Sequence, residues 1–225
     1  MEIVLLTLPL LASIISGFFG KHLGDRNSEV ITSMFVSISA FLSLFLFYEV
    51  VVNDYESNVV IATWINSGTL NVNWSIKIDA LSSVMLVVVT LVSSLVHIYS
   101  IGYMSHDPHK PRFMAYLSLF TFSMLTLVTA DNFLQLFFGW EGVGLCSYFL
   151  IGFWFKKDSA NAAAIKAFVV NRVGDFGFAL GIFLIFYTFG TVNYSEVFQK
   201  IPQIIDKELL FLGIYIKIID LMCIL

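Results

Sequence analysis

Four ionisable residues with the means to do chemistry lie in or at the edge of long apolar stretches of the 225-residue sequence: Glu141, Lys166, Arg172 and Asp175. An ionised side chain is costly to place in a bilayer, so each such residue is a candidate functional residue. A group held between burial, which disfavours its charge, and an opposite charge, which favours it, can exchange a proton near neutral pH. The pattern therefore favours proton transfer as the chemistry of this chain.

Glu141 is the deepest of the four candidates. It lies eight residues into an apolar segment that begins at Phe133, which corresponds to roughly 12 Å along a helix. No basic residue lies within one helical turn of Glu141 in the sequence, so a partner must come from another helix. A purely structural salt bridge between helices is the alternative interpretation. We favour proton handling because a carboxylate at this depth is costly to keep for packing alone.

The other candidates belong to a later apolar segment. Arg172 and Asp175 are three residues apart and share a helix face, so they either neutralise each other or relay charge. Lys166 precedes Arg172 by six residues, which places it on a different face of the helix. It either extends to the membrane interface or serves as an inward relay cation. His97, in an earlier segment, is either a proton shuttle or a hydrogen-bonded interior residue.

Seven apolar segments are long enough to hold these residues in a bilayer, since a membrane helix needs about 20 mostly apolar residues. They cover residues 3–19, 30–52, 81–104, 113–130, 133–155, 167–189 and 209–225. The first is expected to be a retained helix, because it has neither the positive start nor the cleavage site of a signal peptide. The sequence thus predicts an all-α, polytopic transmembrane helix bundle of about seven helices, with residues 1–225 forming a single integral membrane domain.

The composition excludes several other classes of protein. The chain is 58% hydrophobic and 12% charged, with a mean hydropathy of +0.87, which argues against a soluble globular enzyme and against disorder. A net charge of −4 argues against a nucleic-acid partner. The two cysteines, Cys146 and Cys223, both lie in apolar runs, so neither a disulfide framework nor a zinc site is expected.

The connections between the segments carry further predictions. Residues 59–64 and 69–78 alternate apolar and polar side chains around Ser67 and Gly68, which predicts a short hairpin outside the membrane. Only Asp131 and Asn132 separate two segments, which should therefore form a tight antiparallel pair. Glycines near the charged residues should allow close helix contact and leave room for water; they are Gly139, Gly142, Gly144, Gly177 and Gly181.

Lysine and arginine are distributed unevenly among the loops. The first, third and fifth loops together hold Lys21, Arg26, Lys110, Arg112, Lys156 and Lys157. The second, fourth and sixth loops hold only Lys77, Lys200 and Lys207. By the positive-inside rule, the first, third and fifth loops should face the cytoplasm or the mitochondrial matrix, and the N-terminus should face the opposite side.

Three runs of sequence resemble one membrane-protein family. Residues 139–152 read GWEGVGLCSYFLIG, residues 166–175 read KAFVVNRVGD, and residues 74–82 read WSIKIDALS. These runs resemble the antiporter-like subunit of respiratory complex I (NADH-quinone oxidoreductase) that is called subunit L in bacteria and subunit 5 in mitochondria. The resemblance implies an N-terminal antiporter-like segment at residues 60–112. It also implies that residues 128–225 are the first, incomplete part of the proton-translocating core.

The resemblance also implies a function, which is proton translocation coupled to NADH oxidation by a multi-subunit complex. It places the family's key glutamate at Glu141, its charged pair at Arg172 and Asp175, and a nearby lysine at Lys166. No redox chemistry and no cofactor is expected on this chain. NADH, FMN, the iron–sulfur clusters and quinone would be used by other subunits. The implied partners are other membrane subunits and the lipid of a bacterial or mitochondrial inner membrane.

One departure from the family pattern leaves alternatives open. In the family, the glutamate works against a lysine in a Gly-Lys-Ser-Ala motif of a broken seventh helix. Lys217 lies in the seventh predicted segment, but its surroundings do not match that motif. The expectation is therefore an N-terminal part of the subunit, from a split or truncated gene. A subunit of a cation/proton antiporter without redox coupling, and a fragment without activity, are the alternative interpretations.

Overall fold

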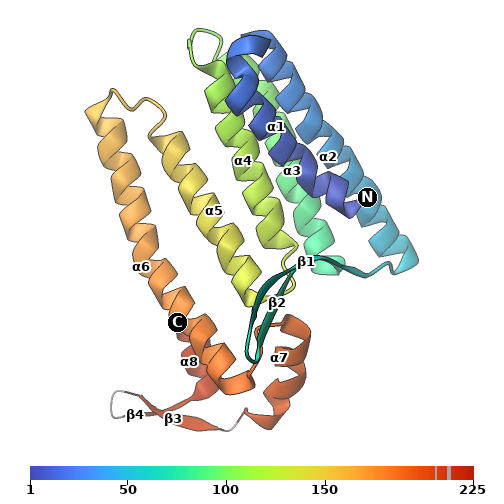
Figure 1. The fold of residues 1–225 in the computed structure, drawn as a ribbon, viewed down its shortest axis with the longest axis vertical. Coiled ribbons are helices and arrows are strands. Elements are labelled where there is room, and N and C mark those ends of the chain that lie inside the picture. The colour runs from blue at the N-terminus through green and yellow to red at the C-terminus, as the bar shows by residue number, and fades with distance from the viewer. Residues whose placement is uncertain (206, 212–213) are drawn as a thin grey trace.

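The computed structural model describes residues 1–205, 207–211 and 214–225 (Figure 1). Its long helices are α1 (Glu2–Leu23), α2 (Asp25–Asn53), α3 (Ala80–Tyr103), α4 (Lys110–Val128), α5 (Phe133–Ile151) and α6 (Asp158–Phe189). The shorter elements are β1 (Ser57–Ser67), β2 (Leu70–Ile78), α7 (Tyr194–Lys200), a 3₁₀ turn (Ile201–Gln203), β3 (Glu208–Phe211), β4 (Ile214–Lys217) and α8 (Ile218–Ile224).

Helices α1 to α6 are each long and apolar enough to cross a membrane. They confirm six of the seven predicted segments and the transmembrane helix bundle. Helix α1 packs against α2 and α4, α2 packs against α3, and α4 packs against α5. Helix α6 lies at the edge of the bundle and contacts α5 (Figure 1). The candidate residues on α5 and α6 are therefore on the outermost pair of long helices.

The seventh predicted span, residues 209–225, is wrong. Its described residues form strands β3 and β4, which pair antiparallel, and the short helix α8. The segment has 17 residues and includes Lys217 and Asp220, which makes it short and polar for a membrane helix. The alternation of isoleucine with other residues around Ile214 and Ile216 suits a strand, because β-branched side chains favour extended backbone.

The predicted hairpin is confirmed. Strands β1 and β2 pair antiparallel from Ser57 opposite Ile78 to Ser67 opposite Leu70. The turn between them contains Gly68 at a φ of 60°, a left-handed backbone conformation that glycine adopts without strain. The hairpin lies at one end of the bundle, beside the connection between α4 and α5 (Figure 1).

The hairpin and the chain after α6 are both tied to the connection between α4 and α5. The Lys77 N–H donates to the Thr129 carbonyl at 2.9 Å, which links β2 to the end of α4. On the other side, the Phe133 N–H donates to the Val192 carbonyl at 3.1 Å, and the Tyr194 N–H donates to the Asp131 carbonyl at 3.2 Å. Helices α4 and α5 pack closely against each other, which confirms the tight antiparallel pair expected around Asp131. The connection between them also anchors the chain that follows the lower end of α6 (Figure 1).

Gln135 is the buried contact that joins α5 to the hairpin. Its side chain is fully buried. The amide oxygen accepts from the Ser75 N–H at 3.0 Å, and the amide nitrogen donates to the Ser75 carbonyl at 2.7 Å. Both bonds satisfy backbone groups that would otherwise be buried beside an apolar helix face. Gln135 thus fixes the hairpin to α5.

Replacing Gln135 by leucine should therefore destabilise the chain. The leucine leaves the Ser75 amide and carbonyl without their side-chain partner, at an expected loss of about 1–3 kcal/mol. The midpoint of thermal unfolding of the chain in detergent measures this loss. Gln135→Glu keeps the acceptor for the Ser75 N–H but buries a carboxylate against the Ser75 carbonyl, and should lose at least as much. A leucine variant as stable as the wild type would show that water satisfies both groups.

The three basic loops lie together at the other end of the bundle. The Ser16 hydroxyl of α1 donates to the Pro111 carbonyl at 2.8 Å, which joins α1 to the start of α4. The Arg112 guanidinium at the start of α4 donates to the Phe153 carbonyl at 3.2 Å, which joins α4 to the connection between α5 and α6. This grouping is what the orientation prediction requires (Figure 1). Which side of the membrane that end faces stays a prediction.

Candidate functional site

Three of the four predicted site residues meet between α5 and α6. Arg172 on α6 forms an ion pair with Glu141 on α5 through its Nη1 atom and the Oε2 atom of the carboxylate. The same Nη1 atom lies 3.6 Å from Oδ2 of Asp175, one turn further along α6. The expected partner of Glu141 from another helix is therefore Arg172. The expected shared face of Arg172 and Asp175 is also present.

Trp140 is a fourth member of this cluster, which we call the α5–α6 charge cluster: Trp140, Glu141, Arg172 and Asp175. Its indole Nε1–H donates to Oδ1 of Asp175 at 2.8 Å. The two oxygens of Asp175 are thus divided between an indole and a guanidinium. No sequence spacing marks Trp140 as a partner of Asp175, although an indole N–H inside a membrane helix needs an acceptor. The indole holds Asp175 in place while Arg172 faces both carboxylates.

The charge cluster lies about halfway along both helices. Glu141 is eight residues from the start of the 19-residue α5, which is about 12 Å along a helix about 28 Å long. Arg172 is 14 residues from the start of the 32-residue α6 and 17 from its end. The cluster is therefore placed well inside the apolar length of both helices.

The charges of the cluster do not balance. Two carboxylates, Glu141 and Asp175, face one guanidinium, Arg172, so the formal charge is −1 when all three groups are ionised. The carboxylate side chains are only 22% and 10% exposed. In a medium of low dielectric an unbalanced negative charge is unfavourable. The three groups therefore leave one formal negative charge uncompensated within the cluster.

A small cavity adjoins the cluster. It has a volume of about 250 Å³ and is lined by Trp140, Val143, Gly144, Ser147, Asn171 and Asp175. It is large enough for several water molecules and offers them polar partners. The room for water that the glycines predicted is thus found beside Gly144. Asn171, a neighbour of Arg172 in the sequence, lies at this cavity and not in the ion-pair network itself.

The glycines of α5 divide into two groups. A Cβ atom on Gly139 would lie 2.7 Å from the Cα atom of Leu127 on α4, and one on Gly142 would lie 2.9 Å from the Ser123 hydroxyl. No atom lies within 4 Å of the corresponding position on Gly144. The predicted close helix contact therefore holds for Gly139 and Gly142. Gly144 instead borders the cavity.

The glycines of α6 face a short element. A Cβ atom on Gly177 would lie 3.1 Å from the backbone oxygen of Leu225. A Cβ atom on Gly181 would lie 3.5 Å from the Cβ atom of Leu225. Leu225 directly follows α8, so these two glycines let the end of α8 approach α6.

Lys166 does not join the charge cluster. It is exposed and lies six residues, or about 9 Å along the helix, from Arg172. It makes no hydrogen bond or ion pair with any residue that the structure describes. Its separation from the Arg172–Asp175 pair agrees with the predicted difference in helix face. The structure supplies no contact that assigns Lys166 a role.

His97 is fully buried between α3 and α4. Its Nδ1 atom lies 2.8 Å from the Ser93 carbonyl, and its Nε2 atom lies 3.1 Å from the Ser118 hydroxyl. The Ser93 hydroxyl in turn bonds the Thr121 hydroxyl at 2.5 Å. Both ring nitrogens are therefore satisfied by groups of these two helices. This geometry favours the interior hydrogen-bonded interpretation of His97 over the shuttle.

The described residues provide no group of three or more His, Cys, Asp or Glu side chains that could hold a metal ion. Cys146 and Cys223 are both free thiols. The polar groups gathered between α5 and α6 are carboxylates, a guanidinium and an indole, which suit proton exchange better than metal binding.

Two family models match the sequence. The one described as "NADH-Ubiquinone oxidoreductase (complex I), chain 5 N-terminus" matches residues 64–114. The one described as "NADH:quinone oxidoreductase/Mrp antiporter, TM" matches residues 130–223. The second match includes the charge cluster and Lys166, whereas the first covers β2, α3 and the loop that follows it.

Curated relatives match the chain over nearly its whole length. NADH-ubiquinone oxidoreductase chain 5 of Chondrus crispus is 52% identical over 98% of this chain and 33% of its own length. The chain 5 protein of Triticum aestivum is 53% identical over 100% of this chain and 33% of its own length. NADH-quinone oxidoreductase subunit L of Rickettsia bellii is 48% identical over 99% of this chain and 35% of its own length.

Solved structures share the fold at lower identity. A chain of an archaeal membrane-bound sulfane sulfur reductase superimposes with a TM-score of 0.75 at 17% identity, over 88% of this chain and 39% of that one. A chain of the Mrp complex from Dietzia sp. gives 0.73 at 23% identity, over 87% of this chain and 20% of that one. The chain therefore belongs to the antiporter-like membrane subunits of complex I, the family of chain 5 and subunit L, and spans about a third of the length of these relatives.

Proposed function

We propose that this chain contributes to proton translocation as a membrane subunit of an NADH:quinone oxidoreductase. The relatives that match it are named as subunits of that enzyme, and the sequence similarity extends over 98–99% of this chain. The observation that carries the proposal is the sharing of Arg172 between the Glu141 and Asp175 carboxylates inside apolar helices. This arrangement has one negative charge too many and therefore accepts a proton.

The proposed proton carrier is Glu141. When Glu141 is ionised, it pairs with Arg172. When it binds a proton, its attraction for the guanidinium falls, and Arg172 is left to pair with Asp175, which the Trp140 indole holds in place. Loss of the proton restores the first pairing. The Arg172 guanidinium thus has two pairing partners, Glu141 and Asp175, and the protonation of Glu141 determines which of them it pairs with.

The rest of the assembly follows from the same proposal. The electron-transfer groups, NADH, FMN, iron–sulfur clusters and quinone, would be bound by other subunits, and no redox step would occur on this chain. Its partners would be other membrane subunits of the complex and the lipid of a bacterial or mitochondrial inner membrane. Residues 60–112 and 128–225 would act as the two antiporter-like parts, and Lys166 would serve as a relay cation between the charge cluster and the nearer membrane surface.

A subunit of a cation/proton antiporter is the second candidate. The family model that matches residues 130–223 includes Mrp antiporters in its description, and the Mrp complex shares the fold. Because that likeness shows the fold alone, the two functions are distinguished by the driving force. The complex I function predicts proton movement on addition of NADH without sodium. The antiporter function predicts proton movement on addition of a sodium gradient without NADH.

Infrared difference spectroscopy of the assembled complex tests the proposed proton carrier. Glu141 should show a protonated carboxyl band that grows and disappears during NADH turnover. The same experiment on Glu141→Gln identifies the band by its loss. If the Glu141 carboxyl keeps one ionic form throughout turnover, the proposal fails.

A further inference from the structure

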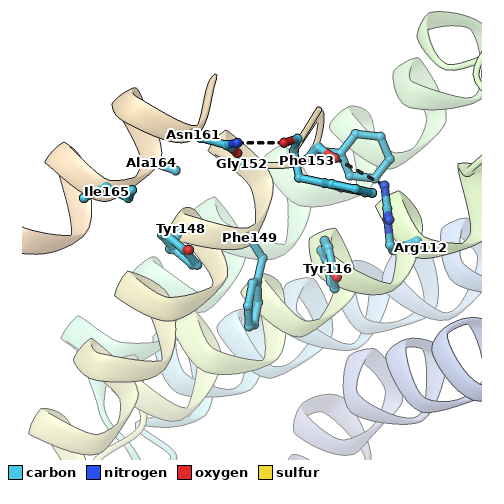
Figure 2. A pocket seen from close by; sticks show the side chains of 10 residues that line it. Arg112, Tyr116, Tyr148, Phe149, Gly152, Phe153, Asn161, Ala164 and Ile165 are labelled. Carbon is cyan, nitrogen blue, oxygen red and sulfur yellow. Dashed lines mark hydrogen bonds between the residues drawn. The ribbon is translucent and has the colours of Figure 1, made fainter. Parts of the chain in front are cut away.

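A second polar cavity lies at the end of the bundle where the basic loops gather, away from the charge cluster. It has a volume of about 420 Å³ between α4, α5 and the start of α6. Figure 2 shows Arg112 on one side of it, and Tyr148, Ala164 and Ile165 on the other. Gly152, which also lines the cavity, is 11 residues beyond Glu141, or about 16 Å along the helix direction. The cavity is therefore at the membrane interface and not at its centre.

Arg112 is the charged side chain of this cavity, and its charge is not balanced. One guanidinium nitrogen, Nη2, donates to the Phe153 carbonyl at 3.2 Å. The Phe153 and Phe155 rings lie 4.6 and 5.2 Å from the guanidinium carbon. The Nε atom is buried and has no hydrogen-bond acceptor. Arg112 also forms no ion pair with any described carboxylate, so it lacks a counter-ion.

Two acidic side chains of this end, Asp107 and Glu29, are engaged elsewhere. Asp107 accepts from the Trp154 indole at 2.9 Å and from the His109 N–H at 2.8 Å. Burial is the largest single influence on the pKa of Asp107 and raises it, but these two hydrogen bonds and the charges of His109 and Arg112 together lower the pKa below its usual value. Glu29 faces Lys110 at 3.8 Å. No described carboxylate lies within ion-pair distance of Arg112, so a bound anion could supply its counter-ion.

The other lining groups suit an amphipathic anion. Tyr116 and Tyr148 bring phenol groups to the cavity, whereas Phe149 and Ile165 form apolar walls. Lys156 and Lys157 are exposed in the loop next to it, and the Lys157 ammonium lies 5.2 Å from the Trp154 ring. Phenols and tryptophan beside basic side chains are typical of the headgroup region of a bilayer. In that region the available anions are lipid phosphates.

We propose that this cavity is a binding site for an anionic phospholipid, with the phosphate on Arg112. The guanidinium offers its free Nη hydrogens to the phosphate oxygens. The tyrosine hydroxyls donate to the phosphate or the glycerol esters, and the acyl chains run along the apolar walls beside Phe149 and Ile165. The site is independent of the proton chemistry of α5 and α6.

Photolabelling tests the site. The membrane complex that contains this chain is reconstituted in phosphatidylcholine vesicles with a small fraction of photoreactive phosphatidylglycerol, and labelled peptides are mapped. Labelling should concentrate in residues 112–116 and 148–165 and should be displaced by unlabelled phosphatidylglycerol. Arg112→Gln should weaken the competition by about tenfold, the effect of losing a charge-assisted phosphate contact. Arg26→Gln, an exposed arginine at the same end of the bundle, is the matched control and should leave it unchanged.

Three results would overturn the proposal. The first is equal displacement by phosphatidylcholine, which would show a site without preference for the anionic headgroup. The second is equal displacement by inorganic phosphate, which would show a soluble anion site and not a lipid site. The third is unchanged competition in Arg112→Gln. Should that variant fail to assemble, the wild-type competition together with Arg112→Lys, which keeps the charge but loses the planar fork, decides the question.

Discussion

Glu141→Gln is expected to lower NADH-driven proton translocation by on the order of tenfold or more. Glutamine keeps the size of the side chain and can still accept from Arg172, but it carries no transferable proton. The substitution also removes one carboxylate, so that Arg172 and Asp175 balance each other and the cluster has no surplus negative charge to attract a proton. Proton uptake by vesicles that contain the assembled complex, followed with a pH-sensitive dye, measures the loss.

The matched control for this experiment is Glu49→Gln. Glu49 also lies in a transmembrane helix, but near the end of α2, where it accepts from the Asn53 amide at 2.6 Å. The same change of charge there should leave proton translocation at the wild-type level. Wild-type translocation by an intact Glu141→Gln complex would contradict the proposed role of Glu141.

Gly139→Ala should lower the stability of the chain. The added Cβ atom would lie 2.7 Å from the Leu127 backbone, so α4 and α5 must separate to admit it. Overpacking of this kind typically costs about 1–3 kcal/mol. The midpoint of thermal unfolding of the chain in detergent should fall, and proton translocation should fall with it, because Glu141 and its partners move with α5.

Gly144→Ala separates the steric effect from the change of residue type. It lies on the same helix, and no atom is within 4 Å of the new Cβ position. Alanine favours helix over glycine by about 1 kcal/mol at either position, so Gly144→Ala should be neutral or stabilising. If both variants unfold at the same temperature, the close approach of α4 and α5 at Gly139 does not limit stability.

Much of the fold is predictable from the sequence because the bilayer imposes strong local rules. Length and hydropathy alone place six helices, and alternation around Gly68 places the hairpin. The same rules fail for residues 209–225, where an apolar composition suits either a membrane helix or a strand. There the charges of Lys217 and Asp220 are the better guide, since both lie inside the segment.

The site is predictable in type but not in detail. The depth of Glu141 requires a partner from another helix, but nothing in its own segment indicates that the partner is Arg172. The hydrogen bond between Trp140 and Asp175 joins residues 35 positions apart in the sequence. The one between Gln135 and Ser75 joins residues 60 positions apart. Such contacts depend on how helices and hairpin pack in three dimensions, which local periodicity does not contain.

Helix α6 is fixed at one end, because the chain that follows it is hydrogen-bonded to the connection between α4 and α5. The lower end of α6 is held near Phe133 and Asp131 by two backbone hydrogen bonds, whereas its upper end meets α5 through a loop. Arg172 lies 17 residues above the lower end, which is an arm of about 26 Å, so a tilt of about 4° would swing the guanidinium by about 2 Å. A swing of that size is comparable to the difference between a close ion pair and a broken one. Because Asp175 lies on α6 and moves with it, a small tilt of α6 would separate Arg172 from Glu141 and leave it beside Asp175.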